Sequence, residues 1–253
     1  MGGAVGWGGN NGILTDSTFN NNKAGNIGGL QWWGRNGTCS GCNFTNNSAN
    51  LNGGGFGSSS PNFILSNCIF TNNHAKQNGG GLYWNNPYGT VNGCTFIANT
   101  ADSFGGAVCW AFNNGNLVNS IFTDNNASAG GAIYWFGSNG VVNSCTFTNN
   151  IATTGGAIYW TIASSMINCN FVNNKWINSN TKSNGIHANG TNLNINGGNG
   201  IVDLYTKGTL SGVSIVVLNN ETYYYPPNSN INLPNKKQYE INKLSSLQEN
   251  HNN

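Results

Sequence analysis

Residues 130–160 read GGAIYWFGSNGVVNSCTFTNNIATTGGAIYW, and the stretch begins and ends with the same six letters, 25 residues apart. The same Gly-Gly step recurs along the chain. Its starts are Gly2, Gly28, Gly53, Gly79, Gly105, Gly130 and Gly155. A fixed period of this length is the signature of a repeat architecture in which each unit stacks on its neighbour.

Other positions repeat in the same register. Each unit has a Phe near its end, an Asn three residues after it, a Cys or Ser two before it, and a mostly apolar residue five before it. The Phe and Asn columns of units two to seven are Phe44, Phe70, Phe96, Phe122, Phe147, Phe171 and Asn47, Asn73, Asn99, Asn125, Asn150, Asn174. The cysteines of the third column are Cys42, Cys68, Cys94, Cys145 and Cys169.

The residue types favour strands over helices. Gly, Asn and β-branched residues dominate each unit, and helices longer than one turn are not expected from them. In the quoted unit we expect three short strands, at residues 132–135, 141–143 and 145–148. The sequence predicts an all-β parallel β-helix of about 7–8 coils of 25 or 26 residues, with three strands per coil and ~4.8 Å between coils.

Stacking explains why single positions repeat so strictly. In a parallel stack each position lies above its own copy, so it must hold a residue that stacks on itself. Cys and Phe, two residues apart, point to one side of a strand and are expected inside, where each buried Phe contributes ~1.5–3 kcal/mol. Stacked Asn amides suit a turn, and the Gly-Gly step suits a bend with positive φ.

The motifs Phe147-Thr148-Asn149-Asn150 and Gly130-Gly131-Ala132-Ile133 resemble the Phe-x-x-Asn and Gly-Gly-Ala-Ile tetrapeptides of chlamydial polymorphic membrane protein repeats. The Asn-rich adhesin-like surface proteins of methanogenic archaea use the same scheme, and the Asn content here is similar to theirs. The resemblance covers residues 2 to about 190. It implies a right-handed β-helix displayed outside the cell as a stalk or adhesin.

The repeat pattern is lost after Asn174. We expect a β-helix domain over residues 1–195, whose end holds one or two degenerate coils. Residues 196–253 are expected to form a C-terminal cap, or the start of a following β-sandwich module, with a polar tail. The chain opens directly on repeat sequence, and we expect it to be part of a longer polypeptide.

Two aromatic columns follow the Gly-Gly step. Trp84, Trp135 and Trp160 share the face of the inward apolar column, which places them inside or at a coil corner. Tyr83, Tyr134 and Tyr159 alternate with them and are expected to face solvent. One interpretation is that tryptophan is core and tyrosine merely suits a strand surface. The other is that these six residues form an aromatic platform that binds glycans or a partner protein.

The seven cysteines do not form the paired Cys and His pattern of a zinc site. Cys39 and Cys42 make one Cys-x-x-Cys, but in register Cys39 takes the apolar position. We therefore expect buried, hydrophobic cysteines with no metal and no cofactor. A disulfide between stacked neighbours such as Cys68 and Cys94 stays an alternative, although it would need distortion.

Many parallel β-helices degrade polysaccharides, so an enzyme is the main competing hypothesis. Acid–base cleavage of a glycosidic bond needs two carboxylates ~5–9.5 Å apart. The repeats hold only Asp16, Asp102 and Asp124. We place Asp16 and Asp124 ~19 Å apart along the axis, expect no His beside Asp102 and Asp124, and interpret Asp124 as an Asn substitute. The expectation is a chain that is not an enzyme.

The composition limits the kinds of partner that the chain is expected to bind. Only 6% of the residues are charged and the net charge is +2, so the sequence lacks the basic patch that nucleic acid requires. No apolar run is long enough to span a membrane. We expect an extracellular surface protein, an adhesin or stalk, with glycans or proteins of another cell surface as partners. The outward threonines make ice binding a third alternative, although Asn, Ile and Val interrupt them.

Overall fold

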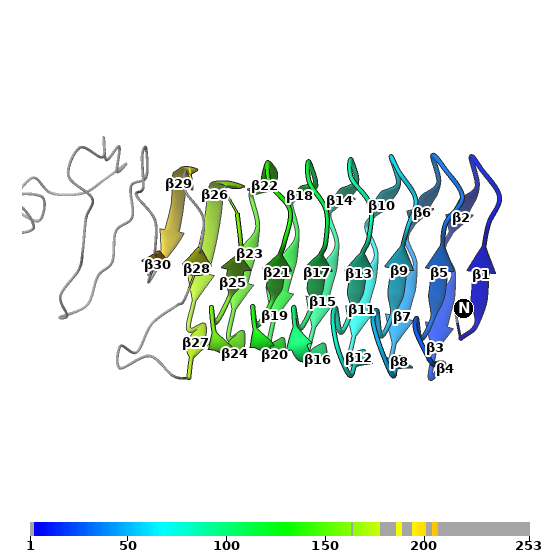
Figure 1. Ribbon diagram of the computed structural model, residues 1–253, viewed down its shortest axis with the longest axis horizontal. Coiled ribbons are helices and arrows are strands. Elements are labelled where there is room, and N and C mark those ends of the chain that lie inside the picture. The colour runs from blue at the N-terminus through cyan, green and yellow to red at the C-terminus, as the bar shows by residue number, and fades with distance from the viewer. Residues whose placement is uncertain (1–2, 163, 178–185, 189–193, 201–203, 207–253) are drawn as a thin grey trace, which may run out of the picture.

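The computed structural model describes residues 3–162, 164–177, 186–188, 194–200 and 204–206. These residues form a rod of stacked coils, and each coil's strands lie beside those of the next (Figure 1). All of the strand pairs are parallel, and neighbouring coils pair in three sheets. The predicted parallel β-helix is confirmed, with about seven turns.

The first sheet takes one strand from each coil. In spatial order its nine strands are β1 (Val5–Trp7), β5 (Leu30–Trp32), β9 (Phe56–Ser58), β13 (Leu82–Trp84), β17 (Val108–Trp110), β21 (Ile133–Trp135), β25 (Ile158–Trp160), β28 (Ile186–Ala188) and β30 (Leu204–Thr206). This sheet carries both aromatic columns.

The second sheet takes two short strands from each coil, separated by a two-residue bend. The first row is β2 (Ile13–Thr15), β6 (Thr38–Ser40), β10 (Ile64–Ser66), β14 (Thr90–Asn92), β18 (Asn116–Val118) and β22 (Gly140–Asn143). The second row is β3 (Thr18–Asn20), β7 (Asn43–Thr45), β11 (Ile69–Thr71), β15 (Thr95–Ile97), β19 (Ile121–Thr123) and β23 (Thr146–Thr148). The rows merge in β26 (Ser164–Val172), which also pairs with β29 (Asn194–Gly200).

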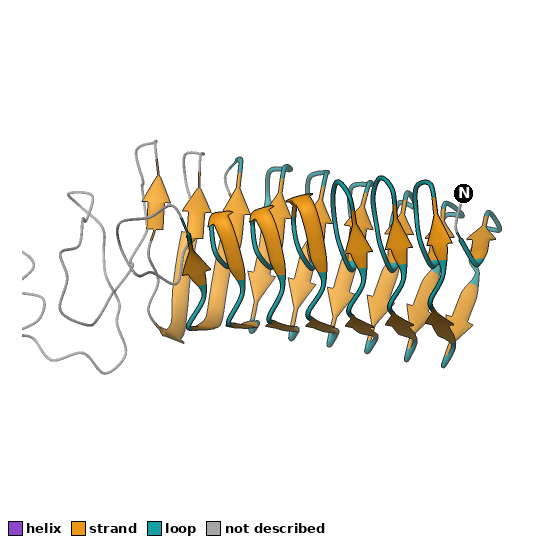
Figure 2. Ribbon diagram, turned by 90° about the horizontal axis from the view of Figure 1, so that it is seen from below, coloured by secondary structure: helices purple, strands orange, loops and turns teal. Residues whose placement is uncertain are grey.

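The third sheet contains β4 (Lys23–Ala24), β8 (Ser48–Ala49), β12 (His74–Ala75), β16 (Thr100–Phe104), β20 (Asn126–Ala129), β24 (Ile151–Thr154) and β27 (Lys175–Trp176). Figure 2 shows its short strands along one side of the rod. The sequence analysis assigned residues 141–143 and 145–148 to separate strands, and both lie in the second sheet. The third sheet is built from residues that the sequence analysis assigned to no strand.

The stacked strands continue to Thr206, past the domain boundary expected at residue 195. The other residues of the expected cap or module, 201–203 and 207–253, lie outside the described residues.

Phenylalanine forms the first internal ladder. Phe96 pairs in register with Phe70 and Phe122, and its ring stacks on theirs at centroid distances of 4.7 and 4.9 Å. The column runs unbroken from Phe19 to Phe171. Each stacked aromatic pair adds about 0.5–1.5 kcal/mol to the energy of burial.

Tryptophan forms the second ladder, with one repaired gap. Trp84 and Trp110 stack at 4.6 Å, whereas Ser58 takes the tryptophan position in its own coil. The fully buried ring of Phe63 fills the space, 5.0 Å from Trp32 and 5.9 Å from Trp84. The core therefore stays filled although the repeat is broken at this position.

Buried asparagines form the third ladder and satisfy one another. The Oδ1 atom of Asn99 accepts from the backbone N–H of Asn73 at 3.0 Å and from its Nδ2 at 2.9 Å. The Nδ2 of Asn99 donates to Asn125 Oδ1 at 3.1 Å and to the carbonyl of Phe70 at 2.9 Å. Each amide thus bonds the coil above and the coil below, as a buried polar group must.

A second set of asparagines serves the bends. Each coil turns at residues with φ near +55°, and most of these outside the Gly-Gly step are Asn, such as Asn72 and Asn149. Asn adopts this left-handed conformation at lower cost than most residues. Asp124, with φ of 56°, takes the same turn position and acts as the expected Asn substitute.

The Gly-Gly step needs its two glycines for different reasons. Gly130 has a φ of +64°, as predicted for the bend. A Cβ atom on Gly131 would lie 2.1 Å from the carbonyl oxygen of Gly156 in the next coil. The second glycine therefore allows the close approach of two coils.

Replacing Asn99 with Ala removes the four hydrogen bonds of its side-chain amide and leaves the backbone N–H of Asn73 without the acceptor it uses. At about 1 kcal/mol for each bond lost, we expect a loss of at least about 3 kcal/mol in the free energy of unfolding, measured by urea denaturation. The control is Asn116→Ala on the exposed side of β18, which should cost less than about 0.5 kcal/mol. Equal effects of the two changes would contradict the ladder.

Ala98 occupies a left-handed turn position, with φ of 52°, where five of the other coils have Asn. Ala98→Asn should therefore raise the free energy of unfolding by about 1 kcal/mol, because Asn tolerates this conformation better than Ala. A decrease in the urea midpoint would show that the turn is not left-handed.

Candidate functional site

The tryptophan column lies in the interior. Trp84, Trp135 and Trp160 are 0% exposed, as are Trp32 and Trp110. The interpretation that tryptophan is core is confirmed. The suggestion that tryptophan edges join a surface platform is wrong, because the chain entering the second sheet covers the indoles; the Gly89, Gly115 and Gly140 positions lie directly against them.

The tyrosine column lies on the outer side of the same strands, as alternation requires. Tyr83, Cys109, Tyr134 and Tyr159 are partners in register. Tyr83 and Tyr159 are partly exposed, whereas Tyr134 is only 6% exposed and Cys109 is fully buried. The expectation that all three tyrosines face solvent is therefore wrong at Tyr134.

Two phenylalanines cover Tyr134. Phe104, at the end of β16, lies 4.4 Å from the Tyr134 ring, and Phe136, just after β21, lies 4.4 Å from it on another side. Phe104 and Phe136 also meet edge to face at 5.8 Å, and Tyr159 stacks on Tyr134 at 4.7 Å. We call these four residues, Phe104, Tyr134, Phe136 and Tyr159, the aromatic patch.

The patch presents ring surface to solvent around a buried centre. Phe136 is 36% exposed, and Phe104 and Tyr159 are partly exposed. The sequence analysis missed both phenylalanines because neither belongs to a repeated column. A signal was present: Phe104 stands where the two preceding coils have Asn52 and Asn78, so an aromatic ring interrupts a polar column.

Burial changes the acidity of the patch. Desolvation, and then the neighbouring Tyr159, raise the pKa of Tyr134 to about 12, and desolvation also raises the pKa of Tyr83. The Tyr134 phenol therefore stays protonated and uncharged where it packs within the aromatic patch.

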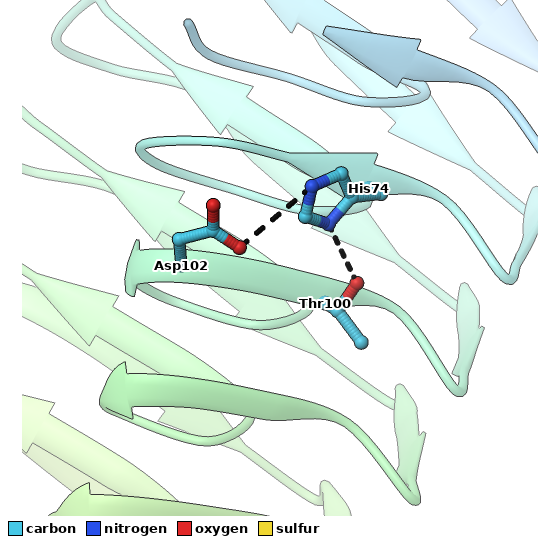
Figure 3. Close-up of polar contacts among 3 residues, drawn as sticks. All are labelled: His74, Thr100 and Asp102. Carbon is cyan, nitrogen blue, oxygen red and sulfur yellow. Dashed lines mark hydrogen bonds and ion pairs between the residues drawn. The ribbon is translucent and has the colours of Figure 1, made fainter. Parts of the chain in front are cut away.

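A polar contact lies on the third sheet. His74 Nδ1 lies 2.9 Å from Thr100 Oγ1, and His74 Nε2 lies 3.7 Å from Asp102 Oδ1 (Figure 3). The expectation that no His accompanies Asp102 is wrong, because stacking places the His74 and Thr100 positions side by side.

His74 lies between a hydroxyl and a carboxylate, as a catalytic base can, but its distance to the Asp102 carboxylate is long. The His74 and Asp102 side chains are 40% and 60% exposed, and 3.7 Å exceeds hydrogen-bond length. Water screens an ion pair of this kind, which is worth at most about 1 kcal/mol. We interpret it as a surface contact between coils.

All seven cysteines are buried, as expected for small hydrophobic residues, and none is bridged in the structure. Burial raises the pKa of Cys109. One group was not anticipated: the sulfur atoms of Cys39, Cys42 and Cys68 lie within 4.8 Å of one another. Hydrogen bonds from the Cys39 and Cys94 thiols lower the pKa of Cys68, whereas hydrogen bonding to Cys42 and Cys68, together with burial, raises that of Cys39.

The raised pKa of Tyr134 predicts a late phenol ionisation. The unfolded chain releases this proton near pH 10 and the folded chain only near pH 12, so the stability that Tyr134 contributes is lost as pH rises through that window. In a spectrophotometric pH titration of the folded chain, Tyr134→Phe should remove one phenol that ionises well above pH 10. Removal of a phenol that titrates near pH 10 would show that Tyr134 is solvated.

The comparisons agree with this architecture. The model of the Chlamydia polymorphic membrane protein repeat matches residues 67–83 and 144–159. Each segment runs from a turn before the Phe column to the strand after the Gly-Gly step. No curated protein and no solved structure matches the chain. The stacked coils and the two matched segments agree with β-helix repeats of the polymorphic membrane protein type.

Proposed function

We propose that this chain is a non-catalytic, extracellular surface protein whose solenoid presents the aromatic patch to neutral glycans on another cell. The patch is the observation that carries the proposal. Three rings pack around Tyr134 on an outer surface that exposes some isolated apolar side chains but is rich in Asn, Thr, Ser and Gly. An exposed aromatic group of this kind marks an interaction site on a polar protein.

The chemistry of the patch favours sugars. An aromatic face carries partial negative charge and attracts the polarised C–H groups of a pyranose ring. Because only 6% of the residues are charged, the surface has little to offer an acidic polysaccharide or a strongly charged protein.

The family match supports the surface location. Polymorphic membrane protein repeats are typical of surface or outer-membrane proteins, and the chain carries two segments of that type. Within the described residues no helix is long and apolar enough to span a membrane.

A purely structural stalk is the second candidate. The nine parallel strands of the first sheet, from β1 to β30, form a continuous rod that suits a spacer. Polysaccharide cleavage has weaker support, because His74 and Asp102 are exposed and the pair provides one carboxylate where acid–base cleavage needs two.

The double variant Phe136→Ser/Tyr159→Ser tests the proposal. Both side chains reach solvent, so the coil should still fold, and loss of two stacking faces should weaken glycan binding at least about tenfold, or 1.4 kcal/mol. Binding to a panel of immobilised neutral glycans and to intact cells is the measurement, with circular dichroism to confirm folding.

Tyr88→Asn is the matched control. Tyr88 is 61% exposed but makes no ring contact with the patch, and its turn position holds Asn in five other coils. The control should bind like the unmodified chain. Unchanged binding by the double variant would leave the stalk as the better account, and a wild-type chain that binds no glycan would contradict the proposal directly.

A further inference from the structure

Cys39 departs from the repeat in a way that has a chemical consequence. Its position is the inward apolar one on β6, between Leu14 on β2 and Leu65 on β10. The later coils hold Val91, Leu117, Val142 and Met166 there. In this coil alone, a third thiol is therefore placed beside the stacked thiols of the cysteine column.

The three sulfur atoms converge inside the solenoid. Cys42 and Cys68 stack in neighbouring coils, and Cys39 precedes Cys42 across the bend at Gly41. All three residues are at most 1% exposed, and their sulfur atoms lie within 4.8 Å of one another. In a trigonal-planar complex with metal–sulfur bonds of about 2.3 Å, the sulfurs are about 4.0 Å apart, which this spacing accommodates.

Backbone donors support negative charge on two of the sulfurs. The N–H of Ser17 donates to Cys42 Sγ and the N–H of Cys42 donates to Cys68 Sγ, both at 3.4 Å. Hydrogen bonds to the charged form favour a thiolate. As thiols, Cys42 and Cys68 instead donate to the carbonyls of Ser40 and Ser66 at 3.3 and 3.2 Å.

We propose that Cys39, Cys42 and Cys68 form a buried three-thiolate site for Cu(I). Thiolate ligands select soft ions, and Cu(I) is the soft ion of the first-row metals. Zinc usually takes four ligands, and among the described residues no fourth His, Cys, Asp or Glu joins this group. On binding, three S–H bonds are exchanged for three Cu–S bonds, three protons leave to solvent, and no electron is transferred.

The repeat supplies variants that should fold. Cys39→Leu restores the residue that both neighbouring coils use, and Cys68→Ser places the residue that Ser120 provides in the same column, where its hydroxyl accepts from the Cys94 N–H. Cys145→Ser makes the same chemical change in a distant coil and is the matched control.

The test measures Cu(I) retained by the reduced chain under anaerobic conditions, with Cu(I) supplied as its acetonitrile complex against bicinchoninate as competitor. Both the native chain and a chain refolded with Cu(I) are used, because the site is closed. We expect one Cu(I) per chain, with three sulfurs at about 2.3 Å by X-ray absorption. Cys39→Leu and Cys68→Ser should each reduce retention at least tenfold, whereas Cys145→Ser should not.

Three results would overturn the proposal. The first is no stoichiometric retention by either preparation of the wild-type chain. The second is retention by Cys39→Leu equal to that of the wild type. The third is a disulfide between two of the three cysteines in chain isolated without added oxidant, found by mass spectrometry.

Discussion

The Asn99 amide shows the constraint on which the fold depends: every inward residue must bond or pack with its own copy in the next coil. Its carbonyl accepts two donors from Asn73, and its NH₂ group donates to Asn125 and to Phe70. A slip of one residue would turn the whole inward set outward and leave these groups unpaired. The buried amides therefore fix the register, and the stacked rings of the Phe and Trp columns contribute the larger share of burial.

This constraint acts only on inward positions and bends, which leaves the outer surface free to vary. The aromatic patch arises where that freedom is used. Phe104 stands in register with Asn52 and Asn78, and the Phe136 position holds small or polar residues in other coils except at Trp33. The three-thiol group arises in the opposite way, from one inward substitution, Cys39, inside a column that is otherwise aliphatic. A repeat protein gains specific chemistry at the places where one coil departs from the others.

The same distinction explains what the sequence could and could not predict. The parallel β-helix, the Phe, Asn and Cys ladders and the interior tryptophans follow from columns of like residues, and all are confirmed. The sequence analysis missed three features: the cover over Tyr134, the Phe63 ring in the gap at Ser58, and the contact of His74 with Asp102. Each depends on a side chain outside the repeated columns, whose neighbour is set by loop conformation and coil-to-coil packing.

The strand count shows a similar limit. The sequence analysis divided the coil at Gly and Asn residues, but a single left-handed residue such as Ser144 bends a strand without ending its sheet. The third sheet, conversely, uses strands as short as two residues, for which alternation of apolar and polar residues gives almost no signal.

The central claim is that like lies upon like across successive coils, and nuclear Overhauser effects test it most directly. In chain with ¹⁵N-labelled asparagine, the account predicts strong effects linking the backbone N–H of Asn73 to the side-chain NH₂ of Asn99, and that of Asn99 to Asn125, at separations of 26 residues. Effects displaced by one residue, or no contact between these amides in the folded chain, would contradict it.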